Sequence, residues 1–384
     1  MRNSIQTFRF ILPAVLAAFL LHSCGKSDKP EDDSLRIILG ASSVKDTKAA
    51  IGSLDDLKNS HQGFGVFGYK TRTANQTFTF TRLFDNTSVE YDSDDQIWTY
   101  SPTRYWDSNP ENISYQFLAY WPHLAATSAN QNDPDAPWVT AVDVNNLTSR
   151  EDMSYTLHNI ANWQDVAQSD TKDFLTSAKF GYYRTNTGET EVFGNRTVIF
   201  DFDHILSKLI VKAYYEGVLD NHVTIYNVTL SGQEILLPGG SSDYEKTLSS
   251  LTSGFQTIQK GAAAQTVSQV LYNDANGCQI QEDAFKENAQ DDDYIPTPVC
   301  EWLTVPTDGW TGLTMSVSYS VGSSSAQTSD IANVSIGVEN VNEMEAGKSY
   351  MLIFKFNTQG GIELETMWIN GWNDAYLNRE VYNW

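Results

Sequence analysis

Apolar and polar residues alternate with a period of two along most of the chain, in short stretches separated by polar turn residues. This alternation is typical of β-strands that bury one face. The first such stretch places Leu35, Ile37, Leu39 and Ala41 on one face. Further strands are predicted at Phe64–Tyr69, Thr77–Leu83, Trp98–Tyr100, Tyr115–Tyr120, Val198–Phe202, Leu206–Tyr215, Val223–Leu230, Leu313–Val321, Ile331–Val338, Tyr350–Phe356 and Ile362–Trp368. The pattern predicts an all-β chain built as two β-sandwiches in tandem.

Two short stretches depart from this period. Ser53-Leu54-Asp55-Asp56 has the form of a capping box and predicts a brief helix that ends at about Ser60. The pattern over Thr156–Gln168 is ambiguous and compatible with a helix.

Turn residues and composition suggest how the chain divides. The polar stretch Tyr183–Asn195 places a boundary between an N-terminal sandwich, residues 35–194, and a C-terminal sandwich, residues 195–372. Ser241–Gln290 is rich in Ser, Gln and Ala and weakly patterned, so we expect a long excursion within the second sandwich.

The first 23 residues have the features of a signal peptide. Two positively charged residues, Arg2 and Arg9, lie before the apolar run Phe10–Leu21. This run is too short to span a membrane. Leu21-His22-Ser23-Cys24 resembles a bacterial lipobox, which predicts acylation of Cys24; a secretory cut without lipid is the alternative. Residues 24–34 form a polar, acidic tether. The tether resembles the surface-export tag of outer-membrane lipoproteins in some Gram-negative anaerobes, and this resemblance implies a surface-exposed protein of the cell outer membrane. Lipid is the only membrane attachment that the sequence predicts.

Composition narrows the classes of function. Lys and Arg number 25 against 48 Asp and Glu, which gives a net charge of −23. So acidic a chain repels polyphosphate, and nucleic acid is excluded as a partner. Aromatic residues make up 12% of the chain and charged residues only 19%, a balance that favours β-rich secreted proteins.

The sequence contains no pattern that indicates a catalytic or metal site. The six histidines lack ligand spacing. The dinucleotide-binding motif G-x-G-x-x-G is matched by Gly63-Phe64-Gly65-Val66-Phe67-Gly68. That motif requires a helix after its first glycines, but the residues here continue as a strand pattern. We predict no enzyme, no metal and no cofactor. Cys278 and Cys300 remain after Cys24 is lipidated, and a disulfide and two buried thiols are both compatible with the sequence.

Aromatic residues gather in one region of the N-terminal half. Trp98, Tyr100, Tyr105 and Trp106 are followed by Phe117, Tyr120 and Trp121. Exposed rings would form a sugar-stacking platform, and buried rings would pack between sheets with their polar tips reaching partners. The buried arrangement is the favoured interpretation.

The same region resembles the fimbrillin (Mfa-like) family, the lipoprotein pilins of type V fimbriae in Gram-negative anaerobes. Four segments carry the resemblance, in the family's order: Trp98–Pro122, with W-x-Y-x-P-x-R-Y-W; Asp173-Phe174-Leu175-Thr176-Ser177-Ala178; Phe202–Leu209, with F-x-H-x-L-S-K-L; and Gly347-Lys348-Ser349-Tyr350 with Ile369-Asn370-Gly371-Trp372. The resemblance implies two transthyretin-like β-sandwich domains and a role as a fimbrial subunit or as a tip or anchor adhesin. A surface glycan-binding lipoprotein is the alternative function.

The resemblance also implies how the chain would assemble. An Arg-directed protease would release the first strand, Leu35–Ser43, and a partner's strand would fill the groove by β-strand addition. Lys48-Ala49 stands at the matching cleavage position, so either another protease acts or the anchor is retained. Residues 373–384 lie beyond the last core strand, with Leu377 and Val381 on one alternating face.

The opposite face of residues 373–384 carries Tyr376, Tyr382 and Trp384. We expect this tail to be the donor strand, and packing on its own second sandwich is the alternative. The expected partners are other fimbrial subunits, the outer membrane through the lipid, and a host or bacterial surface ligand.

Overall fold

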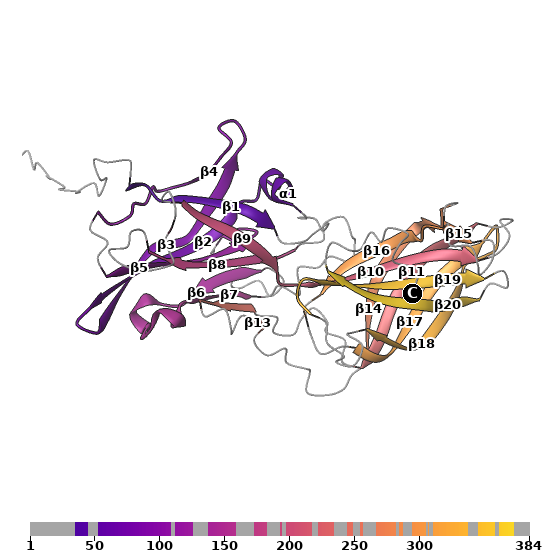
Figure 1. Ribbon diagram of the computed structural model, residues 1–384. Helices are drawn as coiled ribbons and strands as arrows, with labels where there is room; N and C mark the ends of the chain where they lie inside the picture. Colours follow the sequence, from indigo (N-terminus) through magenta and orange to yellow (C-terminus); the bar gives the residue numbers. More distant parts are fainter. Residues whose placement is uncertain are drawn as a thin grey trace, which may run out of the picture. The chain divides into compact units, whose positions relative to one another are not determined.

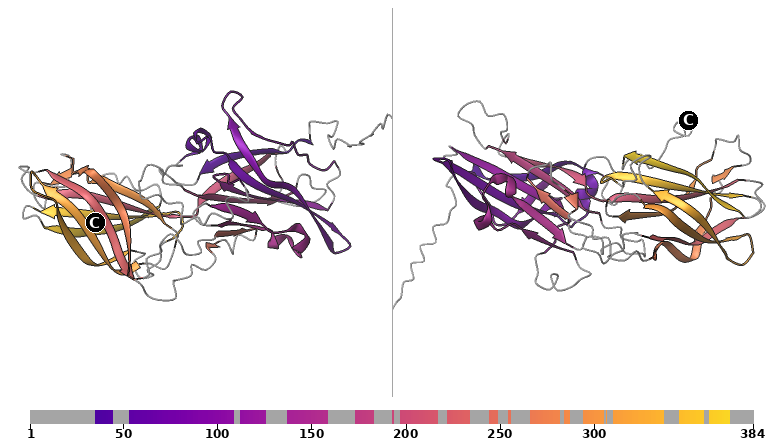
Figure 2. Two further views of the ribbon diagram at one scale, coloured as in Figure 1. Left: turned by 180° about the vertical axis from the view of Figure 1, so that it is seen from behind. Right: turned by 90° about the horizontal axis from the view of Figure 1, so that it is seen from below.

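The computed structural model describes residues 35–44, 53–108, 112–125, 137–158, 173–182, 193, 197–216, 222–233, 244–248, 254–255, 266–281, 284–286, 294–304, 306, 310–336, 345–357 and 361–371. The regular elements in these ranges are overwhelmingly strands, arranged in four sheets (Figures 1 and 2). The prediction of an all-β, sandwich-like fold is confirmed. The helices of this part are α1 (Leu54–Asn59), η2 (Val144–Asn146) and η3 (Arg150–Asp152).

The first sandwich combines a seven-stranded sheet, in the order β1-β9-β8-β5-β2-β3-β4, with a four-stranded sheet, in the order β13-β12-β7-β6. Their bounds are β1 (Ile38–Val44), β2 (Phe64–Ala74), β3 (Thr77–Asp92), β4 (Ile97–Tyr100), β5 (Ile113–Trp121), β6 (Trp138–Ala141), β7 (Ser154–His158), β8 (Leu175–Gly181), β9 (Thr197–His204), β12 (Tyr244–Thr247) and β13 (Gly254–Phe255). Phe67 and Leu118 of the larger sheet pack against Val139 and Leu157 of the smaller one. This contact buries one face of each sheet.

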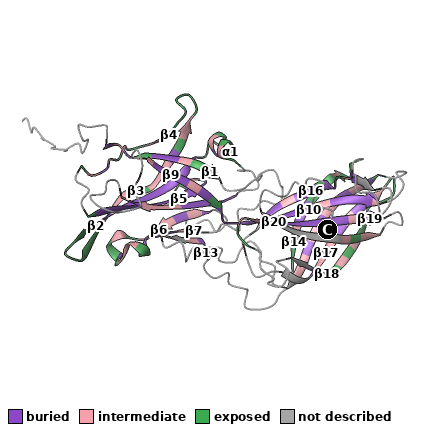
Figure 3. Cartoon of the chain, viewed as in Figure 1, coloured by how far each residue is buried: buried purple, intermediate pink, exposed green. Residues whose placement is uncertain are grey.

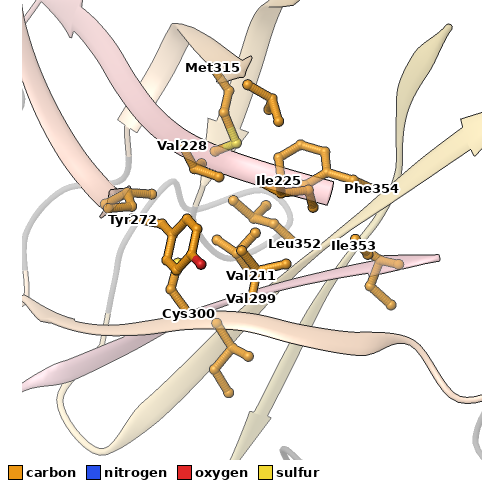
Figure 4. Packing of buried hydrophobic residues seen from close by; sticks show 14 of the residues in the cluster. Val211, Ile225, Val228, Tyr272, Val299, Cys300, Met315, Leu352, Ile353 and Phe354 are labelled. Atoms are coloured by element: carbon orange, nitrogen blue, oxygen red, sulfur yellow. The ribbon is translucent and has the colours of Figure 1, made fainter. Parts of the chain in front are cut away.

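The second sandwich has a five-stranded sheet, β15-β10-β19-β20 with β16 paired to β10, and a four-stranded sheet, β14-β11-β17-β18. Their bounds are β10 (Ser207–Glu216), β11 (Val223–Gln233), β14 (Thr266–Gln279), β15 (Phe285–Lys286), β16 (Thr297–Thr304), β17 (Trp310–Val321), β18 (Gln327–Ile336), β19 (Lys348–Asn357) and β20 (Ile362–Gly371). Val211 and Leu352 of the first of these sheets meet Val228 and Met315 of the second (Figure 4). Figure 3 shows how buried residues run along the inner strands of both sandwiches.

The pairing of β9 differs from the predicted division of the chain. The boundary at residues 194/195 places Val198–Phe202 in the second sandwich, but β9 is hydrogen-bonded to β1 and β8. Phe200 and Phe202 accordingly lie in the core of the first sandwich. Alternation identifies a strand and says nothing of its neighbours, so this assignment depends on long-range pairing that the pattern does not contain.

The structure describes part of the ambiguous stretch and corrects one other expectation. Within Thr156–Gln168, residues 156–158 belong to the strand β7, and residues 159–168 lie outside the described residues. The segment Ser241–Gln290 is not an excursion confined to the second sandwich, because β12 pairs with β7 of the first and β14 is a long strand of the second. The helix expected after Ser53 is confirmed as α1, with the Ser53 hydroxyl accepting from the Asp56 N–H at 3.1 Å.

Two of the segments that carry the family resemblance meet in space. Nδ1 of His204, at the end of β9, lies 2.5 Å from a carboxylate oxygen of Asp173, just before β8, and both side chains are buried. The Phe174 carbonyl also accepts from the Ile205 N–H at 3.1 Å. These contacts fix the point at which the chain leaves β9 for β10.

The glycines of the G-x-G-x-x-G stretch have a packing role. They lie in and beside β2, where the phosphate-binding motif would need the start of a helix. A Cβ at Gly65 would lie 2.4 Å from the ring of Tyr120, and one at Gly68 would lie 2.5 Å from the ring of Phe84. The absent side chains make room for aromatic rings of the neighbouring strands.

We therefore expect Gly65→Ala to lower the free energy of unfolding by about 1–3 kcal/mol, the usual penalty of overpacking a core. Denaturant unfolding of the full chain measures this change. Gly40→Ala is the matched control, because its added methyl group would lie 3.3 Å from a terminal methyl of Ile199, a contact that small side-chain shifts relieve. Equal destabilisation by both substitutions would contradict the explanation.

Candidate strand-exchange site

The first strand closes the seven-stranded sheet by pairing on two sides. Residues 35–37 form an antiparallel bridge with residues 104–106, in which the Ile37 N–H donates to the Arg104 carbonyl at 2.9 Å and the Trp106 N–H donates to the Leu35 carbonyl at 2.8 Å. Immediately afterwards, β1 pairs with β9 in parallel (Figure 1). Residues 35–44 are thus hydrogen-bonded to two parts of the chain, to β9 and to the residues 104–106 that follow β4.

The side chains of this strand complete a core. Leu35, Ile37 and Leu39 are 8%, 0% and 1% exposed, and Ala41 packs against the same cluster. Burial of a side chain such as Ile37 or Leu39 contributes roughly 1.5–3 kcal/mol each. The strand predicted from alternation is therefore present, and its removal would open an apolar groove.

The opposite face of β1 carries a polar contact. The Ser42 hydroxyl donates to a carboxylate oxygen of Asp201 on β9, and the second oxygen of Asp201 accepts from Nζ of Lys179 on β8 at 2.6 Å. These side chains are partly exposed, so the ion pair adds only a modest stabilisation. Its main effect is to fix the register of β1 on β9.

The edge that faces residues 35–37 is held rigidly in place. Asp107 accepts hydrogen bonds from Nζ of Lys70 at 3.0 Å and from the hydroxyl of Tyr115 at 2.8 Å. The Asp107 N–H donates back to the Tyr115 hydroxyl at 3.1 Å, and burial raises the pKa of Tyr115 well above its usual value. Asp107, which directly follows the W-x-Y-x-P-x-R-Y-W pattern, therefore anchors the acceptor edge to β2 and β5.

A tyrosine from β4 binds the same strand. The Tyr100 hydroxyl donates to the Ile37 carbonyl at 2.6 Å, and burial raises the pKa of Tyr100. The Tyr100 ring packs edge-on against Phe84, with ring centroids 5.2 Å apart, so the core orients its hydroxyl towards the first strand. The backbone of residues 104–106, the Tyr100 hydroxyl and the edge of β9 together form a binding site for one extended segment.

Most of the aromatic cluster is part of this core, and Tyr120 lies in the neighbouring core against the smaller sheet. Trp106 and Trp121 are 2% and 5% exposed, and Tyr115, Phe117 and Tyr120 are fully buried. Trp98, Tyr100 and Tyr105 are half-buried and pack against the same cluster. This burial agrees with the favoured interpretation of the cluster as core. The buried rings are not available to stack on a sugar.

Several predicted site residues lie outside the described residues. These are Cys24, Lys48, Ala49 and the tail residues Tyr376, Leu377, Val381, Tyr382 and Trp384. Lipidation, cleavage and strand donation therefore stay predictions. The structure has Cys278 and Cys300 as thiols on β14 and β16, with Cys300 among Tyr272, Val299 and Val211 (Figure 4).

The described residues hold no group of three or more His, Cys, Asp or Glu side chains arranged to bind a metal ion. Within the same ranges, no helix has the length and apolar character needed to cross a membrane.

Sequence reasoning missed the residues that receive the first strand. Tyr100 and the segment Arg104–Trp106 were noted as aromatic, but their backbone and hydroxyl partners on residues 35–37 were not predicted. Asp201 was also missed, although it alternates with the apolar residues Phe200 and Phe202 on β9. The available signal was an acidic residue placed between two buried phenylalanines.

Tyr100→Phe removes the hydrogen bond to the Ile37 carbonyl and leaves the ring in place. We expect the free energy of unfolding to fall by about 1 kcal/mol and amide exchange to accelerate first in residues 35–44. Hydrogen exchange read by mass spectrometry checks this. Tyr91→Phe is the control, because it also removes a tyrosine hydroxyl next to Trp98 but leaves the hydrogen bond between Tyr100 and the Ile37 carbonyl intact. Unchanged exchange of residues 35–44 in Tyr100→Phe would contradict the assigned role.

Comparison with known proteins places this geometry in context. A family model described as fimbrillin-like matches residues 47–372, a range that begins after β1 and stops before the tail. A fimbrial protein from Bacteroides vulgatus is 17% identical, with 88% of this chain and 99% of that chain covered and a TM-score of 0.56. A proposed cell adhesion protein from Bacteroides uniformis is 15% identical, with 90% and 100% covered and a TM-score of 0.42. The search of curated proteins gives no match.

At these identities the structural similarity concerns the fold alone, and the similarity to the Bacteroides vulgatus protein extends over nearly all of both chains. The family model, in contrast, covers most of the sequence and includes all four segments noted above. The chain belongs to the fimbrillin-like family.

Proposed function

We propose that this protein is a fimbrial subunit, or a tip or anchor adhesin, that is exported as a lipoprotein and assembled by donor-strand exchange. The observation that carries the proposal is the two-sided pairing of residues 35–44 with residues 104–106 and with β9. Membership of the fimbrillin-like family supports association with other fimbrial subunits and a place at the cell surface.

The position of this strand suits it for exchange. It is the first element of the compact unit that begins at Leu35, and it lies at the end of its sheet. A single cut between β1 and α1 would leave it attached to the rest of the chain by non-covalent contacts only. The strand could then leave without breaking any other connection of the fold.

The groove cannot stay empty once the strand leaves. Loss of β1 would expose Phe200 and Phe202 of the core together with unpaired N–H and C=O groups along β9. An incoming extended segment would restore both the ladder hydrogen bonds and the apolar contacts. Such a head-to-tail contact does not close on itself, so repetition of it grows a filament.

The candidate cut is Lys48-Ala49, in the segment between β1 and α1. Helix α1 would remain with the body of the protein, because Leu57 is buried in the same core and Ser53 caps the helix. Residues 373–384 are the proposed donor strand towards the next subunit, since both of their alternating faces carry apolar side chains.

The proposal is tested by locking β1 to β9. Ser42 and Asp201 touch through their side chains on neighbouring strands, so the pair Ser42→Cys and Asp201→Cys is designed to form a disulfide across the two strands. We expect the oxidised double variant to fold but to be absent from ladders of sheared fimbriae, and we expect reduction to restore it. Electrophoresis of unboiled samples measures the ladders.

The reduced form of the same variant is the matched control, because only the cross-link differs. Ser42→Cys alone controls for disulfides formed with Cys278 or Cys300. If the oxidised variant enters fimbriae as efficiently as the reduced one, exchange at this strand is wrong.

Lipid attachment has its own test. Cys24→Ala should move the protein from the membrane fraction to the soluble fraction, because acyl chains on Cys24 are the only membrane anchor that the sequence predicts. Cell fractionation and incorporation of labelled palmitate measure this. Cys278→Ala keeps Cys24 and should leave both readouts unchanged. Absence of label in the unmodified protein would refute lipidation.

A further inference from the structure

We propose that the groove under β1 does not accept residues 373–384 of a second copy, and that it accepts a strand of a different subunit with an apolar triad followed by a small residue. This inference rests on the proposed function and names the partner of the same site.

The groove demands three apolar residues at alternate positions. Leu35, Ile37 and Leu39 are 8%, 0% and 1% exposed, and all three belong to one core cluster. A charged side chain at such a position would be buried without a designed partner, which is strongly unfavourable. A polar side chain would leave its hydrogen-bonding groups unsatisfied.

The next position of the strand demands a small residue. A Cβ at Gly40 would lie 3.3 Å from Cδ1 of Ile199 and 3.4 Å from Cδ1 of Trp98. A large side chain would have to displace both groups, and Trp98 is itself packed edge-on against Phe64 with ring centroids 5.1 Å apart. A donor therefore needs the pattern apolar-x-apolar-x-apolar-small.

The tail has no segment of this pattern. Its alternate-residue triads, from the one that begins at residue 373 to the one that begins at residue 380, each contain Asn, Asp, Arg or Glu. The result is independent of strand direction, because reversing the strand leaves the members of each triad unchanged. Every register within residues 373–384 thus places a polar or charged group at a buried position.

The most apolar registers fail for specific reasons. With Leu377 at the position of Leu35, Arg379 takes the position of Ile37, and Tyr382 takes that of Gly40. With Asn373 at the position of Leu35, Asn378 takes that of Gly40, and Glu380 takes that of Ser42. Ser42 lies against Asp201, so the second register sets two carboxylates side by side.

The chemistry of the site therefore specifies the partner. The donor to this chain is a different fimbrial subunit, and the tail of this chain enters the groove of a different subunit in turn. Contacts between unlike chains determine the order of subunits, whereas a self-complementary tail would give a polymer of one chain.

Strand exchange into the full chain tests this inference. A specific protease site inserted between Lys48 and Ala49 allows the chain to be cut with β1 still bound. Fluorescent peptides are then added in excess: residues 35–44, residues 373–384, and residues 373–384 with Arg379→Ile and Tyr382→Gly. The matched control peptide carries Asn378→Ile and Tyr382→Gly, which adds the same residues but retains Arg379.

We expect the peptide of residues 35–44 and the Arg379→Ile, Tyr382→Gly peptide to bind. We expect the unmodified tail and the control peptide to bind at least about a hundredfold more weakly, because each buries a polar or charged group in the groove. Fluorescence anisotropy of the cut chain measures the four affinities.

The outcomes separate this inference from the proposed function. Failure of the residue 35–44 peptide to enter the cut chain would count against strand exchange at this site altogether. Binding of the unmodified tail as tight as that of residues 35–44 would overturn this inference and leave strand exchange standing. Weak binding of the Arg379→Ile, Tyr382→Gly peptide would overturn the apolar-triad requirement.

Discussion

The first sandwich depends on one segment that satisfies two edges at once. Residues 35–37 pair with residues 104–106, residues 38–44 pair with β9, and the same segment places Ile37 and Leu39 in the core. Unpaired strand edges and exposed apolar faces both lead to association with other chains. A single strand therefore closes this sandwich, and its loss would leave an open groove able to bind an extended segment.

Strong burial and easy removal are compatible here because of where the strand lies in the topology. β9 pairs with β1 on one side and β8 on the other, so removal of β9 would split the sheet, whereas removal of β1 would not. β1 pairs in parallel with β9 alone, and parallel pairs are slightly less stable per residue than antiparallel ones. Under the proposed exchange, its apolar contacts would hold it until a replacement is present, and its place at the end of the sheet would allow that replacement without rearrangement of the other strands.

The sequence predicts the strands better than their partners. Alternation located β1, β5 and β9, and the capping pattern located α1, because these signals are local. The assignment of β9 to the first sandwich and the contact of Tyr100 with Ile37 join residues far apart in the chain. Local pattern carries no information on such pairs, so the boundary at residues 194/195 and the acceptor edge could not be predicted. Likewise, the strand pattern after Gly65 was sufficient to reject a phosphate loop, but the ring of Tyr120 that requires a glycine there comes from a neighbouring strand and could not be predicted.

A groove of this kind also needs protection against the chain's own segments. In a fibre assembled as proposed, the tail of each copy would be at high local concentration, so a tail that fitted the groove would compete with the donor of another subunit. Arg379 lies between Leu377 and Val381, so it falls at a buried position in the register that would otherwise place both of these apolar side chains in the groove. Charges placed against an unwanted partner are a common source of specificity. On this view the polar residues of the tail are a feature of assembly, since they reserve the groove for a strand of another subunit.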